Sequence, residues 1–528
     1  MIEGSVLIVG SGPSGLAAAI ALGKQGVKAR IVDSASGPAE SSRALAVQAR
    51  SLEIFDLWGI VDDVTSRGLP MHGVRLYGED KRLLVQMRLG ELPTRYPYML
   101  SLPQSETEKV LIDHVKELGF NIERDTELTD IDFDSEGCMV KLQKSNGEQE
   151  EARFQWVIGC DGAHSTVRRL SHAEFEGKEY PQQFLLADVR INWPLAPNEA
   201  HIFTAPEGIL ACFPMPGGYY RVVANKPKGE TEPAPDIDEV RRLMTTRGPK
   251  EFQVDDLKWS SNFFIHARLV ESMQRGRVFL VGDAAHIHSP ALGQGMNTGI
   301  QDAANLGWKL ALVVKGLASE ALLESYSNER WPVERGVLSQ TDFTTRVMDG
   351  ENRFFAWLRD LIAPVILANK RVSAHVRELV SELAVGYTDS PIVLPYKGDL
   401  PFKPGERLPD ATVTKNGHDI RLYELLRDPG HHLLLMADQW TDPQVTAIFN
   451  GEMTVHSIRR KTSDEALVLQ DSKGEIVSLF GWDCACLIRP DGYVGAVSGI
   501  ADVGSMLEEY SRKIHVIPTA MRSKASLM

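Results

Sequence analysis

A glycine-rich turn between a strand and a helix, close to the amino terminus, constrains the fold of this chain most. Val6–Val9 is an apolar run of strand length, and it is followed directly by Gly10-Ser11-Gly12-Pro13-Ser14-Gly15. The first glycine permits a tight turn, the second lets the backbone approach a pyrophosphate, and the third lets the next helix pack on the strand. The pattern predicts a β-α-β unit that binds a dinucleotide at the start of the helix.

The second strand of this unit offers an acidic residue to the same ligand. Residues Ser14–Gln25 have helical composition, Gly26 suits the helix end, and Ala29–Asp33 is predicted to be a strand. A carboxylate at the end of that strand can bind a pair of ribose hydroxyls, so Asp33 and the neighbouring Ser34 are candidate ligands. The motif alone leaves FAD and NAD open as the dinucleotide.

A second strand, loop and helix lies far along the chain. The apolar run after Arg277 ends at Gly282-Asp283, and Gly293-Gln294-Gly295-Met296-Asn297 opens an amphipathic segment that reaches Lys309. Asp283 can bind a sugar hydroxyl or a bridging water, while the glycine-rich backbone offers N–H groups and a positive helix end to an anion. One chain with both motifs is expected to hold a large cofactor at two ends.

A further motif, Cys160-Asp161-Gly162-Ala163-His164-Ser165-Thr166-Val167-Arg168, lies between these two, so it is the second motif in chain order and the Gly282–Asn297 segment is the third. Asp161 follows an apolar strand, Gly162 permits a close backbone turn, and Ser165 can cap a helix. Taken alone, the motif fits an ordinary helix cap with an Arg168 salt bridge equally well.

The pattern of strands changes in the middle of the chain. Residues 183–266 contain short strand-like runs with Pro- and Gly-rich turns, which predicts a mostly antiparallel sheet inserted into the α/β unit. The fold class is therefore α/β, with a Rossmann-type domain, an inserted sheet, a helical segment and a small α/β domain at the end. The expected boundaries are 1–182 and 267–345 for the dinucleotide-binding domain (with 73–99 as a candidate addition to the inserted sheet), 183–266 for that sheet, 346–390 for the helical segment, 391–409 for a proline-rich linker and 410–528 for the last domain.

Composition excludes several classes of protein. The formal charge of −14 argues against a nucleic-acid-binding surface. The apolar run at the amino terminus is cut by glycines and lacks a basic leader, so we expect neither a signal peptide nor stable membrane insertion. The five cysteines are scattered and odd in number, which is typical of reduced thiols in a cytoplasmic protein. No cysteine–histidine cluster has zinc-site spacing, and we expect no metal.

In this order and spacing, the three motifs resemble those of the FAD-dependent aromatic hydroxylases of the para-hydroxybenzoate hydroxylase fold. The resemblance runs from about residue 5 to 345. Within this range, Tyr326, Glu329-Arg330 and Pro332 also match the family pattern. It implies non-covalently bound FAD, with Arg43 beside a cofactor phosphate and Gln104 bonded near the FAD. The implied cofactor-binding residues are Gly10, Gly12, Pro13, Ser14, Gly15, Asp33, Ser34, Arg43, Gln104, Asp161, Gly162, Arg168, Gly282, Asp283, Pro290, Gly293, Gly295, Met296 and Asn297.

The last domain resembles the thioredoxin-like appendix of the phenol hydroxylase branch. Gly405–Asp410 opens it, and Arg489-Pro490-Asp491-Gly492-Tyr493 lies near its end. Residues 437–442 occupy the place of the thioredoxin Cys-x-x-Cys and contain no cysteine. The resemblance therefore implies a packing or dimer role for this domain, with a homodimer as one expected assembly, rather than disulfide chemistry.

The implied activity is that of a single-component monooxygenase. NAD(P)H, with NADPH favoured, reduces the FAD, and molecular oxygen forms a flavin C4a-hydroperoxide that hydroxylates a small phenolic or polyketide-type aromatic substrate. No residue is assigned as catalytic, because the cofactor supplies the difficult chemistry. Expected substrate contacts come from the inserted sheet and from the loop 286–295: His201, Phe203, Phe213, Met215, Tyr219, Arg221, His288 and Pro290.

Alternatives remain open at this point, among them a plain NAD dehydrogenase and a reductase on the same scaffold. A Baeyer–Villiger or epoxidising flavin monooxygenase would carry the same motifs on the same fold. A non-catalytic flavin-binding redox protein would also carry them, although three intact cofactor motifs argue against it. The Trp-x-Trp-x-Ile-Pro segment typical of flavin halogenases is absent from the sequence.

Overall fold

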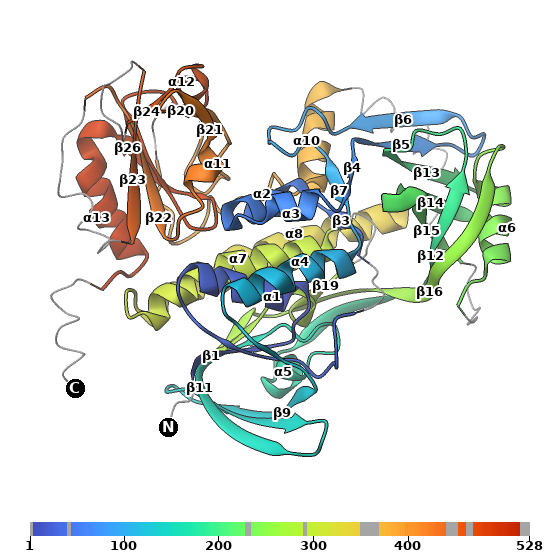
Figure 1. Cartoon of the computed structure of the whole chain (residues 1–528), viewed down its shortest axis with the longest axis horizontal. Helices are drawn as coiled ribbons and strands as arrows, with labels where there is room; N and C mark the ends of the chain where they lie inside the picture. Colours follow the sequence, from blue (N-terminus) through green and yellow to red (C-terminus); the bar gives the residue numbers. More distant parts are fainter. Residues whose placement is uncertain are drawn as a thin grey trace.

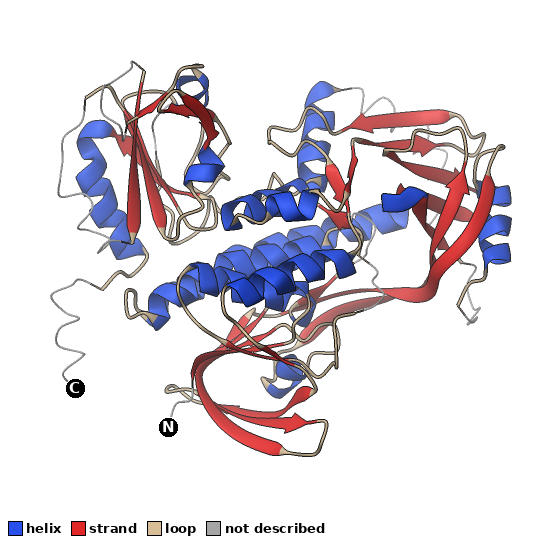
Figure 2. Cartoon of the chain, in the orientation of Figure 1, coloured by secondary structure: helices blue, strands red, loops and turns tan. Residues whose placement is uncertain are grey.

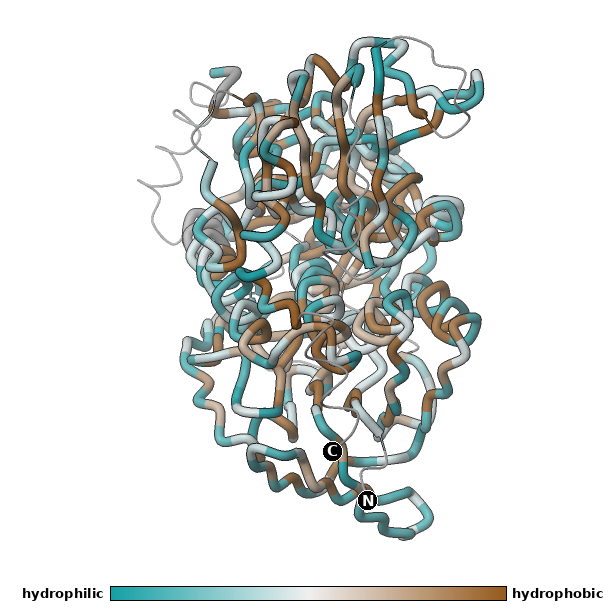
Figure 3. Tube along the Cα trace, turned by 90° about the vertical axis from the view of Figure 1, so that its left-hand side faces the viewer, coloured by the Kyte–Doolittle hydropathy of each residue, from teal (hydrophilic) through white to brown (hydrophobic). Residues whose placement is uncertain are grey.

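The computed structural model describes residues 4–39, 44–226, 234–288, 293–348, 369–396, 398, 400–439, 452–460 and 468–517. In these residues, two eight-stranded sheets, a seven-stranded sheet and a small three-stranded sheet surround a layer of helices (Figures 1 and 2). Figure 3 shows hydrophobic stretches along many central strands and helices, and hydrophilic turns at the lower end. Within the described residues, no helix combines the length and apolar character that a membrane span requires.

The first sheet carries the amino-terminal β-α-β unit and confirms the α/β class. Its order is β17-β18-β11-β1-β2-β8, with β10 and β9 extending from β11, and the ladders from β18 to β8 are parallel. Val9 pairs with Gly159, and Gly159 pairs with Leu280, so three strands end at one edge. The strand bounds are β1 Gly4–Val9, β2 Arg30–Val32, β8 Ile122–Glu123, β9 Thr126–Phe133, β10 Cys138–Lys144, β11 Gln149–Gly159, β17 Gln274–Arg275 and β18 Val278–Leu280.

Two central helices pack closely against each other because small residues line their contact. A Cβ added at Gly299 would lie 2.3 Å from Ser14 Oγ, and one added at Gly307 would lie 2.4 Å from Ala21 Cβ. This contact fixes α7 beside α1 and brings the starts of both helices to the edge where the strands end. The helices of this part are α1 Pro13–Lys24, α2 Ala49–Trp58, α3 Val61–Thr65, α4 Gln104–Glu117, α5 Thr166–Leu170, α7 Gly295–Val314, α8 Glu324–Met348 and α10 Lys370–Val380.

The second sheet is long and mostly antiparallel, in the order β19-β16-β12-β15-β14-β13-β5-β6. Helix α6 (Ile237–Arg247) covers one face over an apolar core, and the other face lies toward the central helices (Figure 1). The strands are β5 Gly73–Tyr77, β6 Leu83–Arg88, β12 Phe175–Asn192, β13 Glu199–Ala205, β14 Gly208–Pro214, β15 Tyr219–Asn225, β16 Gln253–Val270 and β19 His286–Ile287. The three-stranded sheet consists of β3 Ala46–Val47, β4 Leu69–Met71 and β7 Met99–Ser101.

The last domain is a seven-stranded sheet in the order β21-β20-β24-β23-β22-β25-β26. Its strands are β20 Thr412–Lys415, β21 His418–Arg421, β22 His431–Met436, β23 Met453–Arg459, β24 Leu469–Gln470, β25 Cys484–Ile488 and β26 Val494–Gly499. The helices in its described part are α11 Leu422–Leu425, α12 Glu475–Phe480 and α13 Val503–Lys513. All five cysteines of the chain are free and buried.

In its described residues, the proline-rich segment 391–409, which the sequence predicts to be a linker, packs against the domain that follows it. The Leu394 N–H donates to Gly495 O and the Gly405 N–H donates to Val494 O at 2.7 Å, and both acceptors belong to β26. Leu408 is fully buried. This segment therefore contributes packed structure to the last domain.

Candidate active site

The first glycine-rich turn is shaped so that an anion can approach the start of α1. Gly10 has φ of +98°, and a Cβ added there would lie 2.4 Å from Cys160 O. A Cβ at Gly15 would lie 2.0 Å from Gly10 O, so both positions require glycine. A Cβ at Gly12 meets nothing within 4 Å, and no side chain caps α1. Gly12 therefore faces open space beside free helix N–H groups, which fits a pyrophosphate.

Asp33 stabilises this turn from the neighbouring strand end. Its Oδ2 accepts hydrogen bonds from Ser11 N at 2.7 Å and from Ser11 Oγ, and its Oδ1 accepts from Ala35 N at 2.8 Å. The carboxylate keeps part of its surface exposed, and Ser34 is exposed beside it. The geometry is compatible with ribose binding and also gives Asp33 a role in holding the turn.

The Cys160–Arg168 motif supports the turn at Gly282. Asp161 Oδ2 accepts from Thr166 N at 2.7 Å and from Val167 N at 3.0 Å, so Asp161 holds the first turn of α5. Burial raises the pKa of this carboxyl group despite those bonds. Arg168 donates to Ala284 O at 3.0 Å instead of forming the salt bridge that its sequence suggests. The Asp161–Arg168 segment thus positions the turn that carries Asp283.

The third motif presents an exposed carboxylate next to an uncapped helix. Gly282 has φ of +62°, and a Cβ added there would lie 2.3 Å from Ser14 Oγ, so the turn sits directly on α1. Asp283 is exposed at this edge, and no side chain caps the start of α7. A carboxylate beside positive helix ends is suited to a ligand with hydroxyl groups and an anionic end.

Other residues assigned by resemblance have supporting positions. The Asn297 side chain accepts from Gln48 N at 2.9 Å and donates to Ala46 O at 2.9 Å, so it joins the start of α7 to β3. Gln104 donates through its backbone N–H to Ala44 O, and its side chain binds Glu108. Met296 is buried, and Gly293 has φ of +64°. Arg43 and Pro290 lie outside the described residues.

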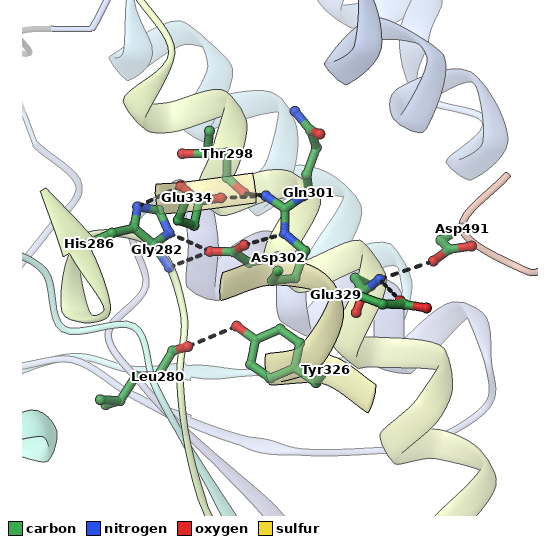
Figure 4. A network of polar contacts seen from close by, with 12 residues as sticks. Leu280, Gly282, His286, Thr298, Gln301, Asp302, Tyr326, Glu329, Glu334 and Asp491 are labelled. Atoms are coloured by element: carbon green, nitrogen blue, oxygen red, sulfur yellow. Dashed lines mark hydrogen bonds and ion pairs between the residues drawn. The ribbon is translucent and has the colours of Figure 1, made fainter. Parts of the chain in front are cut away.

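A buried carboxylate, Asp302 on α7, organises the third motif (Figure 4). Asp302 Oδ2 accepts from Gly282 N at 3.1 Å and from His286 Nε2 at 2.7 Å, while its Oδ1 accepts from Arg330 Nε at 2.6 Å. Arg330 also donates to Thr298 O at 3.2 Å in the first turn of α7. The two ion-pair partners of Asp302 are fully buried with it. One carboxylate therefore ties the Gly282 turn to both central helices.

His286 is held as a cation in this network. Burial lowers the pKa of its imidazole, but the nearby carboxylates of Glu334 and Asp302 outweigh burial and raise it to about 9. Burial opposes the ionisation of Asp302, yet Arg330 and His286 hold its pKa at about 2. The pair is therefore an imidazolium and a carboxylate at neutral pH.

His286, His288 and Glu334 are the residues of the described part of the chain that could share a metal ion. Their ligand atoms lie within 4.8 Å of one another. Arg330 already donates to Glu334 Oε1 at 2.7 Å, and His286 is committed to Asp302. These charges compensate one another, so the cluster is better explained as an ion network than as a metal site.

The inserted sheet places two of the expected substrate residues in one row. Phe213 pairs with Arg221, Arg221 pairs with Asp188, and Asp188 pairs with Trp259, across four neighbouring strands. Both Arg221 and Asp188 are buried and form a bidentate ion pair with two 2.8 Å bonds. Arg221 also donates to Ala44 O, next to the segment that contacts α7. Phe213, Arg221, Asp188 and Trp259 form the Arg221 row.

Other expected substrate residues lie elsewhere. His201 and Phe203 belong to the face that α6 covers, where His201 bonds Ala196 O and Phe203 stacks on Tyr77, so their assignment to the pocket is corrected. Met215 is buried at the turn after β14, and Tyr219 binds Asp256 at the sheet border. His288 lies behind the start of α7, with its Nε2 3.3 Å from Thr298 Oγ1.

Sequence reasoning missed the residues that support the site from behind. Asp188 and Trp259 lie on strands, and only the pairing of the strands brings them to Arg221. Asp302 offered a local signal: it is an acidic residue inside the apolar helix that follows the third motif. A charged group in such a helix is rarely buried without a partner, so its position already indicated an ion pair.

Comparisons with known proteins agree with this geometry. A family model described as an FAD binding domain matches residues 3–341, and one described as the C-terminal region of aromatic-ring hydroxylases matches residues 402–515. The chain is 33% identical to 6-methylpretetramide 4-monooxygenase of Streptomyces rimosus, over 97% of this chain and 94% of that protein. It is 30% identical to pentachlorophenol 4-monooxygenase of Sphingobium chlorophenolicum, over 96% and 95%.

A solved structure extends the likeness to the whole fold. The anhydrotetracycline hydroxylase OxyS from Streptomyces rimosus superposes with a TM-score of 0.80 at 27% identity. The match covers 98% of this chain and 100% of that chain. The likeness therefore includes the last domain as well as the part that carries the three motifs.

The two glycines of the first turn give a prediction with a built-in control. Gly15→Ala places a Cβ against Gly10 O and should lower the stability of the ligand-free protein by roughly 1–3 kcal/mol. Gly12→Ala places a Cβ in open space, so the ligand-free protein should melt like wild type while its Kd for FAD rises about tenfold or more. Melting curves and flavin fluorescence titrations measure both effects. Unchanged FAD affinity in Gly12→Ala would contradict the pyrophosphate position.

The raised pKa of His286 predicts a pH dependence of stability. The unfolded chain loses this proton near the ordinary pKa of 6.5, whereas the folded chain keeps it to about 9. The stabilisation is therefore complete below pH 6.5 and is lost as the pH rises to 9, at about 1.4 kcal/mol for each unit of pKa difference. Melting temperatures of wild type should fall more steeply over this range than those of His286→Gln. Parallel curves for the two proteins would refute the buried imidazolium.

Proposed function

We propose an aromatic substrate and NADPH as the reductant for this chain, which belongs to the family of FAD-dependent aromatic-ring hydroxylases. The chain is a flavin-dependent aromatic monooxygenase that uses FAD and molecular oxygen. The proposed reaction is hydroxylation of a phenolic or polyketide-type aromatic compound, with NADPH as the favoured reductant. The observation that carries the proposal is the meeting of three cofactor motifs at one sheet edge, beside the Arg221 row.

The residues at this edge fit FAD. Gly12 leaves open space at the start of α1 for the pyrophosphate, and Asp283 stands exposed next to the uncapped start of α7 for the flavin half. We propose Gly10, Gly12 and Gly15 as the pyrophosphate turn, Asp33 as a ribose ligand and Asp283 as a ligand of the flavin half. When bound and reduced, FAD supplies oxygen activation, and the protein positions the ring and excludes water.

The Arg221 row is the proposed wall of the substrate pocket. The Asp188 carboxylate compensates the Arg221 guanidinium, so the row presents oriented polar groups without net charge. Trp259, whose ring lies 5.6 Å from the guanidinium carbon of Arg221, and Phe213 add aromatic surface on either side. Such a wall suits a flat ring that carries hydroxyl groups, and two relatives named for a pretetramide and for pentachlorophenol support this substrate class.

We further propose that the last domain is a thioredoxin-like packing domain in a cytoplasmic protein. The parallel pair β22–β23 beside antiparallel β25 and β26 supports the thioredoxin-like arrangement. Five buried cysteines without a disulfide support a reducing compartment. A homodimer is the proposed assembly to be tested by light scattering.

Substrate screening tests the proposed reaction. Purified protein should carry FAD, and phenols and polycyclic aromatic polyketides should stimulate oxidation of NADPH, with NADH as the comparison. Mass spectrometry under isotopically labelled oxygen should show a product with one added oxygen atom on the ring. An oxygen atom inserted beside a ketone would instead indicate the Baeyer–Villiger reaction, and reductant consumption that yields only hydrogen peroxide with every compound would refute the proposal.

The Arg221 row predicts a change in substrate coupling. Removing one member of the buried pair would strand a charge, so the test variant replaces both, Arg221→Met with Asp188→Leu. This variant should fold and bind FAD, yet lose about tenfold or more in kcat/KM for the aromatic substrate while peroxide release increases. Tyr219→Phe, on the same strand but at the sheet border, should match wild type. Equal kcat/KM in all three proteins would remove the row from the pocket.

A further inference from the structure

A buried arginine of the last domain reaches the central helices. Arg489 donates to Glu329 on α8 through two bonds of 2.6 and 2.8 Å, and to Asp491 in its own turn at 2.6 and 3.0 Å. The Arg489 and Glu329 side chains are fully buried, and that of Asp491 is 1% exposed. The guanidinium thus joins a carboxylate of α8 to the turn between β25 and β26.

The same ion cluster continues onto α7. Lys309 donates to Glu329 Oε2 at 2.7 Å and to Asn305 Oδ1 at 2.7 Å. Trp308 Nε1 donates to Asp491 Oδ2 at 3.2 Å. Two cations and two carboxylates therefore balance in a buried contact that joins the last domain to the central helices. Docking costs the hydration of all four charges, so their geometry must be well fixed for the contact to persist.

This cluster is adjacent to the network that holds the Gly282 turn. Glu329 and Arg330 are consecutive on α8, and Asp302 and Asn305 are separated by about one turn of α7. Figure 4 shows Glu329 with Asp491 on one side and Asp302 with Gly282 on the other. The ion pairs around Glu329 therefore fix the rotation of α7 and α8, and the ion pairs around Asp302 depend on that same rotation.

A second route runs through α2. Arg50 on this helix is fully buried and donates to Asp491 O at 2.7 Å. Its guanidinium also lies 4.6 Å from the Tyr493 ring. The backbone N–H of Gln48, before the same helix, donates to Asn297 at the start of α7. The turn Arg489–Asp491 thus contacts three helices, and each of them reaches the cofactor edge.

We infer that Arg489 and Asp491 are positioning residues of the flavin site, so that the last domain sets the geometry of α7, α8 and α2 around the cofactor. The inference rests on the proposed flavin site. It gives the Arg489-Pro490-Asp491-Gly492-Tyr493 motif a function in the monooxygenase reaction, where the sequence suggests only a packing or dimer role. The domain acts without touching the cofactor or the substrate.

The test compares conservative variants of the full-length chain. Arg489→Lys keeps the charge and loses the bidentate geometry. Trp308→Phe removes the bond to Asp491 and leaves a smaller aromatic ring against Arg489. The control is Arg427→Lys, because Arg427 joins the same domain to Asp56 near the carboxyl end of α2, away from the Gln48 and Arg50 end that carries the second route, and lies outside both networks. The measurements are the melting temperature without ligand, the Kd for FAD and the visible circular dichroism of the bound flavin.

Arg489→Lys should raise the Kd for FAD about tenfold and alter the visible circular dichroism of the flavin, with a smaller change of the same kind in Trp308→Phe. Arg427→Lys should change the melting temperature but neither flavin readout. If the test variants lose stability while both flavin readouts stay at wild-type values, the cluster is packing only and the inference is overturned. A wild-type chain that does not bind FAD would instead overturn the proposed function, and the inference with it.

Discussion

The buried carboxylate of Asp302 is the interaction on which the rest of the site depends. A carboxylate taken out of water costs several kcal/mol unless donors surround it. Here the donors are the Gly282 N–H, the His286 imidazolium and the Arg330 guanidinium, which come from the Gly282–His286 segment and from α8. Because all three donors reach Asp302 in the observed arrangement, the carboxylate ties the Gly282 turn, α7 and α8 together. That arrangement places Asp283 and the open start of α7 at one edge.

The central helices carry two such ion clusters, and together they connect the domains. Arg330 belongs to the cluster around Asp302, whereas the preceding residue, Glu329, belongs to the cluster with Arg489. Buried ion pairs contribute little net stability, because desolvation offsets their attraction, but they penalise every other register. The structure uses them where register matters most, since a small rotation of α7 would move the backbone amides at its start.

Much of the fold could be predicted from the sequence, because its signals are local. Gly10–Gly15 predicted the first β-α-β unit, and Gly282-Asp283 predicted a second anchor, since each motif contains its own strand, turn and helix start. The faces of the inserted sheet could not be predicted in the same way. His201 and Phe203 are two positions apart on β13 and therefore share one face, but nothing in the sequence of the strand shows which face α6 will cover. The pairing of Arg489 with Glu329 joins residues 160 positions apart and leaves no local trace.

The protection of backbone amides in the Gly282 turn from hydrogen exchange tests the central role of Asp302 most directly. Hydrogen–deuterium exchange can be followed at residues 280–288 in wild type and in Asp302→Asn, with strand β22 of the last domain as the internal reference. If Asp302 holds the turn, exchange at residues 280–288 should become at least about tenfold faster in the variant, while β22 exchanges as before. Wild-type protection of residues 280–288 in Asp302→Asn would show that the turn is held by other contacts and would contradict the account.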